Sequence, residues 1–219
     1  MKIWNSFTTT TQSVGGTLPL LAAPCSKRMH GAVVSNDLAI GERIAGGTPM
    51  YFNIADRTVK FLKAWKVKTV TADAQAGTTA IVLVKNHISP VLKAGMVIMA
   101  MPEAIAGTGK AVVCGTVTEA EYTYTITVTT NDFDDVKAGD YIVESSSATA
   151  GSKKAIYCQP NSISIEDTVG GDVTLVDIPR GVLYMYKNTI PDCPDAVITN
   201  IQNGGDVHIV WEMFNEITS

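Results

Sequence analysis

The sequence predicts an all-β protein: a barrel or sandwich of short strands, built from a tandem repeat with an offset of 44 residues, with an extended N-terminal arm. Three observations support this fold class. Val, Ile and Thr number 67 of the 219 residues and Leu only 9, and β-branched side chains favour strands. The segment 122–130 alternates between Thr and larger residues with a period of two, as in a half-buried strand. The third observation is the repeat itself.

The composition is that of a folded globular chain and excludes several classes of function. Apolar residues make up 46% of the chain, and charged residues make up 17%. The formal charge is −4, so no basic excess draws in a phosphate backbone, and we expect no nucleic-acid partner. Apolar runs such as 97–101, which ends before Pro102, are far shorter than a membrane span. The sequence therefore predicts a soluble chain without a signal peptide and without a membrane partner.

Residues 1–40 are expected to form an extended N-terminal arm, because no clear hydrophobic period appears in most of this stretch. Its few apolar anchors are Trp4, Phe7, Leu18, Leu20 and Leu21. Two interpretations stay open. In one, the arm contacts another subunit or a capsid, with Trp4, Phe7, Leu20 and Leu21 as the contact residues. In the other, it is a strand folded back on its own barrel.

Residues 41–158 are predicted to form a β domain made of repeats. Segments 93–114 and 137–158 are identical at ten of 22 positions, so they should share one backbone conformation. Gly95 and Gly139 should then occupy equivalent tight turns, and Cys114 and Cys158 equivalent buried strands. Upstream, the strand 78–84 is matched with 122–128. A weaker third copy begins at residue 44, and a suggestive fourth spans 178–183.

Residues 159–219 are expected to be a β-hairpin region packed on the same β domain. The first predicted hairpin spans 162–178 around Gly170-Gly171, and the second spans 196–214 around residues 203–205. Glycine pairs between two apolar runs are typical of tight hairpin turns. Pro191 and Pro194 indicate a loop between the two hairpins.

The residues that usually carry chemistry are scattered. His30, His87 and His208 lack metal-ligand spacing, and His87 and His208 are expected in a loop and on a solvent face. Residues 106–111 resemble a phosphate loop but have Ala at 104 and 111, where Gly and Ser or Thr are required. The acidic residues at 132, 134 and 135 fit a solvated turn better than a calcium loop. The sequence therefore predicts no enzyme, no catalytic residue, no cofactor and no metal.

One part of the sequence resembles a known family. The stretch 41–52, Gly-Glu-Arg-Ile-Ala-Gly-Gly-Thr-Pro-Met-Tyr-Phe, is followed by 57–64, Arg-Thr-Val-Lys-Phe-Leu-Lys-Ala. Together with the Lys-Ala-Gly strand entries, these resemble the head fibre and head decoration proteins of tailed phages and prophages, over residues 30 to 158. The resemblance implies a structural protein of the virion surface, bound to the major capsid protein and homo-oligomeric, with a trimer favoured. No collagen-like or heptad stalk follows residue 158, so a fibre shaft is not implied.

A carbohydrate- or surface-binding β module without catalysis is the alternative function, with a host-surface glycan as partner. Such a module needs exposed aromatic side chains on one face. The i, i+2 pairs Tyr122 and Tyr124, and Tyr184 and Tyr186, are candidates for that face. The competing interpretation, which we favour for each pair, is that these tyrosines belong to the core.

Overall fold

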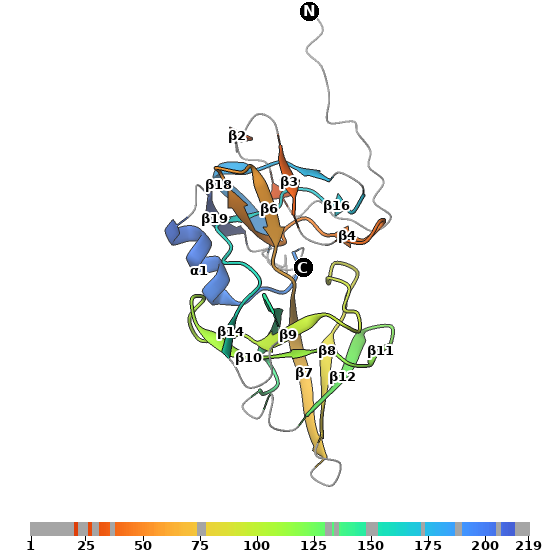
Figure 1. Cartoon of the computed structure of the whole chain (residues 1–219). Coiled ribbons are helices and arrows are strands. Elements are labelled where there is room, and N and C mark those ends of the chain that lie inside the picture. Colours follow the sequence, from red (N-terminus) through yellow and green to blue (C-terminus); the bar gives the residue numbers. More distant parts are fainter. Residues whose placement is uncertain are drawn as a thin grey trace, which may run out of the picture.

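The structure is a computed structural model and confirms the all-β fold class. The residues it describes are 20–21, 26–27, 31–35, 38–73, 78–129, 133, 136–147, 153–171, 174–186, 190–204 and 207–212. Within these residues there are 19 strands and one helix. Figure 1 shows two halves, with the duplicated strands in the lower one and the strands from both ends of the described chain in the upper one.

The lower half is one sheet of eight strands. Their order across the sheet is β11-β12-β8-β7-β13-β9-β10-β14. The bounds in chain order are β7 Ala64–Asp73, β8 Thr78–Val84, β9 Val97–Ala100, β10 Thr108–Val113, β11 Val117–Glu119, β12 Thr123–Thr129, β13 Tyr141–Glu144 and β14 Lys153–Ala155. Strands β7 to β10 make up the first unit of the duplication, and β11 to β14 make up the second.

The pairing registers confirm the repeat and show that the two units face each other. At the offset of 44, the counterpart of Met99 is Val143, and these two residues are directly opposite in the antiparallel pair β9-β13. Gly95 and Gly139 have φ values of 88° and 96°, and each is the third residue of the turn before its strand, at 93–96 and 137–140, so the two turns are equivalent as predicted. The two units are therefore related locally by a two-fold axis between Met99 and Val143.

Strands β8 and β12 are also equivalent in the two units, but at an offset of 45 residues (123 − 78) rather than the expected 44. Strand β8 starts at Thr78 and β12 at Thr123, so the match is shifted by one residue from 122–128. Ile81 lies directly opposite Ile126, and both are fully buried. The predicted match of 78–84 with 122–128 was therefore wrong by one residue. Such a shift exchanges the buried and exposed faces of a strand, and sequence identity alone did not reveal it.

Hydrogen bonding continues around a closed ring of four strands in the lower half. Strand β13 pairs with β9, β9 with β10, and β10 with β14. The ring closes where Ser145, directly after β13, bridges Ile156, directly after β14. Cys114 and Cys158 follow β10 and β14 rather than lying within them, and both are buried.

The upper half is made from sequence on both sides of the duplicated units. A five-stranded sheet has the order β15-β5-β6-β3-β17, and a two-stranded sheet pairs β16 with β4. The bounds are β3 Ala32–Val34, β4 Arg43–Ile44, β5 Pro49–Asn53, β6 Thr58–Phe61, β15 Ser162–Ile163, β16 Thr168–Val169 and β17 Leu175–Val176. Ala32 is buried in this sheet, so the arm boundary predicted at residue 40 lies too far along the chain.

The C-terminal region corrects the prediction of two hairpins. Strands β15, β16 and β17 pair with β5, β4 and β3 rather than with each other. The residues predicted as the second hairpin's first strand form helix α1, Asp195–Gly204. Val197, Ile198 and Ile201 make its buried face, and this i, i+1, i+4 spacing is helical rather than alternating.

Helix α1 connects two parallel strands. Strands β18, Pro179–Tyr186, and β19, Val207–Glu212, pair in parallel, and such a pair requires a crossover connection. Two short strands, β1 at Leu20–Leu21 and β2 at Ser26–Lys27, pair antiparallel with β18. The C-terminal third therefore adds a β-α-β unit to the fold.

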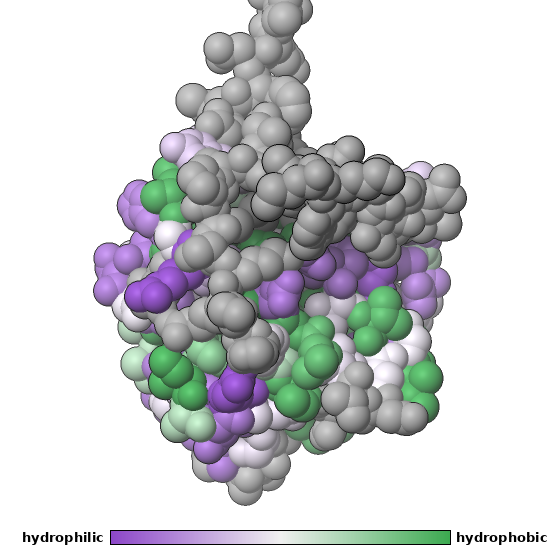
Figure 2. All heavy atoms as spheres, turned by 90° about the horizontal axis from the view of Figure 1, so that it is seen from above, coloured by the Kyte–Doolittle hydropathy of each residue, from purple (hydrophilic) through white to green (hydrophobic). Residues whose placement is uncertain are grey.

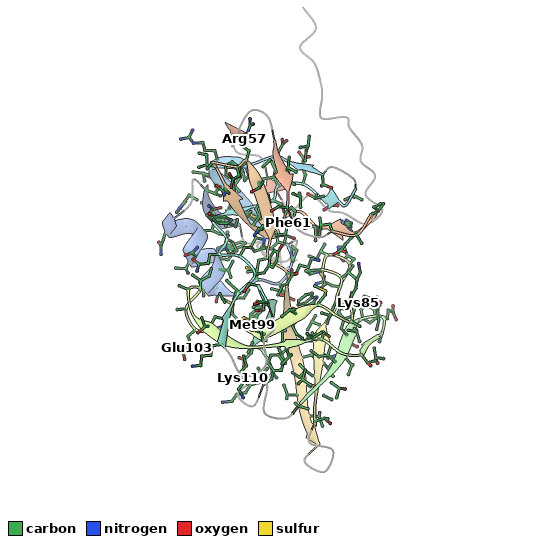
Figure 3. All side chains as sticks on the ribbon, in the orientation of Figure 1. Arg57, Phe61, Lys85, Met99, Glu103 and Lys110 are labelled. Atoms are coloured by element: carbon green, nitrogen blue, oxygen red, sulfur yellow. The ribbon has the colours of Figure 1, made fainter. Side chains whose placement is uncertain are left out.

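Three groups of buried side chains form the core. One lies within the eight-stranded sheet and includes Trp65, Ile81 and Ile126. A second lies in the upper half around Val59 and Phe61. The third joins the halves, because it combines Met99 of the ring with Leu183 of β18 and Val197 of α1. In Figure 3, Phe61 and Met99 lie inside the upper and lower halves, and Arg57 and Lys110 lie at the periphery.

Candidate functional site

Three charged side chains, Glu42, Lys63 and Lys93, form a junction between the halves. Glu42 precedes β4, Lys63 lies between β6 and β7, and Lys93 precedes the Gly95 turn. Lys63 Nζ donates to Glu42 Oε1 at 2.7 Å, and Lys93 Nζ donates to Oε2 at 2.8 Å. The side chains of Glu42 and Lys63 are only 4% and 6% exposed, against 47% for Lys93.

The electrostatics of Glu42 favour the ionised carboxylate. Burial raises the pKa of Glu42, but the hydrogen bonds from Lys63 and Lys93, the positive charge of Lys63 and the backbone N–H of Ala39 outweigh burial and leave that pKa below its ordinary value. Both carboxylate oxygens are already held by ammonium groups. The group is therefore built to tie three segments together rather than to accept a proton from a substrate.

A second ion pair continues the junction. Arg43 Nη2 and Nε donate to Asp167 Oδ2 at 2.6 and 3.0 Å, and the backbone N–H of Gly46 donates to Oδ1 at 2.8 Å. Gly47 follows with a φ of 86°, and a Cβ there would overlap the side chain of Ile190. Glu42 and Arg43 thus form ion pairs that hold segments of the fold together, and Gly47 allows a close approach of Ile190.

The thiols and Tyr141 have raised pKa values because of burial. Burial raises the pKa of Cys158 to about 12, with Glu144 adding to the effect. Burial also raises the pKa of Cys114. For Tyr141, burial and then Asp192, Cys193 and Asp195 raise the pKa to about 12. At neutral pH these three groups are protonated and uncharged.

The predicted contact residues are only partly placed. Trp4 and Phe7 lie outside the described residues. Leu20 and Leu21 form β1, where they are opposite Met185 and Tyr184 of β18 in the same chain. This backbone pairing matches the folded-back interpretation for these two residues, whereas a contact of their side chains with a partner stays a prediction.

Tyr122 and Tyr124 do not form the aromatic face that a glycan-binding module needs. Tyr122 is 67% exposed and Tyr124 is 2% exposed, because Tyr122 precedes β12 and Tyr124 lies within it. The core interpretation is therefore correct for Tyr124 and wrong for Tyr122. Tyr184 is half-buried, and the side chain of Tyr186 is outside the described part. As predicted, His87 and His208 are exposed, in a loop and on β19.

Sequence reasoning missed an exposed apolar surface on the upper half, which we call the upper apolar patch. It consists of Val33, Ile40, Val169 and Leu175, which are 44%, 82%, 57% and 65% exposed. Val33 and Leu175 are directly opposite in the pair β3-β17, so their side chains share one face. The neighbouring pair Ala32 and Val176 faces the core, which leaves Val33 and Leu175 facing outward.

Backbone contacts bring Ile40 and Val169 to the same place. Gly41 N donates to Gly170 O at 2.9 Å, and Gly170 N donates to Glu42 O at 2.8 Å. Thr174 Oγ1 donates to Val169 O at 3.3 Å, so Thr174, directly before β17, lies next to β16. Figure 2 looks onto this end of the molecule and shows hydrophobic residues at the surface between hydrophilic ones. The only sequence signal was the isolated Ile40 before Gly41.

The comparisons with known proteins add no relative. Among the described residues, no group of three or more His, Cys, Asp or Glu is placed to hold a metal ion. No helix in the described part is long and apolar enough to cross a membrane. No family model matches the chain, and no curated protein or solved structure matches it.

Proposed function

We propose that this chain is a structural protein of the virion, a head fibre or capsid decoration protein that binds the major capsid protein. The upper apolar patch carries the proposal, because exposed apolar side chains on neighbouring segments are typical of a protein-binding surface. The architectural use of Glu42, Arg43 and Gly47 supports it as well. These residues of the resembling stretch hold the halves together and leave the surface available for contacts.

Binding to a capsid tests this function directly. The chain would be added to purified capsids of a tailed phage or prophage from its source genome, and the mixture would be sedimented and imaged by electron microscopy. We expect the chain to co-sediment and to add density at regular positions on the capsid surface. A chain that stays in the supernatant at saturating concentration, with capsids that bind a known decoration protein, would contradict the proposal.

The glycan-binding alternative keeps one supporting observation, the 67% exposed ring of Tyr122. An exposed aromatic ring can stack on a sugar. Binding to a glycan array that is lost in Tyr122→Ala and kept in Val113→Ala, which also changes an exposed apolar residue, would favour this alternative. No binding to any glycan on the array would dismiss it.

A further inference from the structure

The upper apolar patch includes Leu175 of β17, a strand at the end of its sheet among the strands that the structure describes. Strand β17 is the last strand of the order β15-β5-β6-β3-β17, and among the described strands it pairs with β3 alone. An edge strand offers unpaired backbone groups to another extended segment. Apolar side chains beside such an edge provide sites for the alternate side chains of an added strand. The patch and the edge together fit an extended, largely uncharged peptide.

The first 19 residues of this chain have that chemistry. They contain Trp4, Phe7 and Leu18 as large apolar residues, the β-branched run 8–11, and Lys2 as their one charged side chain. Threonine and aromatic residues favour extended backbone. The four patch side chains are uncharged, and the nearby Arg43 and Asp167 bind each other. Among the described residues, the charges of Arg43 and Asp167 are thus paired, which suits an uncharged peptide at the patch.

This segment is long enough to reach the patch of a neighbouring copy. Strands β1 and β2 pair with β18, which belongs to a different sheet from β17. Nineteen extended residues span about 60 Å, more than the roughly 45 Å diameter expected for a compact chain of this size. A donor segment and a separate acceptor surface make a head-to-tail contact, which closes into a ring such as a trimer.

We propose that the upper apolar patch and the edge of β17 receive residues 1–19 of a neighbouring copy of the same chain. Each copy then gives one segment and accepts one. The inference concerns self-assembly. It gives the upper apolar patch a different occupant from the capsid of the proposed function, and the tests below distinguish the two.

Oligomeric state tests the acceptor and the donor separately. Light scattering would be measured for the full chain, for a deletion of residues 2–18 that keeps β1, and for the double variant Ile40→Asp with Leu175→Asp. Val113→Asp is the matched control, since Val113 is 58% exposed but lies on β10 in the lower half. We expect the full chain and the control to be oligomers, and the deletion and the double variant to be folded monomers by circular dichroism.

Cross-linking identifies the occupant. The photo-reactive residue p-benzoylphenylalanine would replace Phe7, and ¹⁴N-labelled and ¹⁵N-labelled copies would be mixed before irradiation. We expect mixed-isotope cross-links to peptides that contain residues 33–40 or 169–175. Cross-links within one copy only, cross-links to other surfaces, or a monomeric full chain would overturn the proposal. So would a double variant that remains oligomeric but no longer binds capsids, since the patch would then be a capsid contact and the proposed function would stand.

Discussion

Glu42 shows how much one side chain contributes to this fold. It is almost completely buried and holds two lysines that come from different halves of the molecule. Removing one partner of a buried ion pair usually costs far more than removing an exposed one. The Arg43–Asp167 pair, with side chains 31% and 28% exposed, provides the comparison within the same stretch.

Glu42→Gln should lower the free energy of unfolding at pH 7 by about 3 kcal/mol, because Lys63 is left buried without a counter-ion. Arg43→Gln should cost about 1 kcal/mol or less. The pKa of Glu42 is lower in the folded chain than its ordinary value of 4.5. Its contribution is therefore complete above about pH 4.5 and is lost as the pH falls through the folded pKa. Urea denaturation at several pH values should show the gap between wild type and Glu42→Gln narrowing below pH 4.5; a constant gap would contradict this account.

The thiols provide a test of burial that needs no substitution. Cys158 has a pKa of about 12, so its reactive thiolate is almost absent at pH 8, and Cys114 is also buried. Cys193 is only half-buried. Labelling of the native protein with iodoacetamide, followed by peptide mass spectrometry, should modify Cys193 much faster than Cys114 or Cys158. Equal rates in the native state would show that the two repeat cysteines are not in a closed core.

At the scale of single elements, the turns of the duplication should respond alike. Gly95 and Gly139 have positive φ values, and a Cβ at either position meets nothing within 4 Å. Alanine at each should therefore cost about 1–2 kcal/mol from backbone strain alone. Gly47→Ala should cost clearly more, because the added Cβ also overlaps Ile190. Thermal denaturation of the three variants would check this order, and unequal losses for Gly95→Ala and Gly139→Ala would contradict equivalence of the turns.

The sign of the stability change caused by Thr199→Ala distinguishes a helix from a strand at this position. Thr199 is exposed in the middle of α1, and alanine has the higher helix propensity. Thr199→Ala should therefore stabilise the chain by up to about 0.5 kcal/mol, measured by chemical denaturation. In an exposed strand, as the hairpin interpretation would have it, the same change would destabilise the chain.

The sequence predicted the elements whose patterns are local and failed where partners lie far apart. The repeat at 93–114 and 137–158 and the glycine turns were recognised because identity marks them directly. The helix was missed because three β-branched residues at 197, 198 and 201 also suit a strand. The pairing of β15, β16 and β17 with strands more than a hundred residues earlier leaves no local signal. The upper apolar patch was missed for the same reason, since its four residues meet only in the fold.

At the scale of the whole molecule, the shared core should make unfolding a single event. Ile201 of α1 is fully buried in the same group as Met99 and Val143 of the ring. Ile201→Ala should cost about 2–5 kcal/mol and should lower the melting temperature of both halves together. Differential scanning calorimetry should show one transition before and after the change. Two separated transitions in the variant would mean that the halves are independent folding units.

The register of the duplicated strands has a consequence for the origin of the chain. Met99 is paired with Val143, and Ile81 with Ile126. Each of these strands therefore pairs with the equivalent strand of the other unit. A protein of one unit would be self-complementary and would pair as a homodimer in these registers. Fusion of two such genes joins the partners permanently and allows each half to diverge. The pairing of β7 with β13 has no counterpart between β11 and β9 in the described sheet, so the two units differ there.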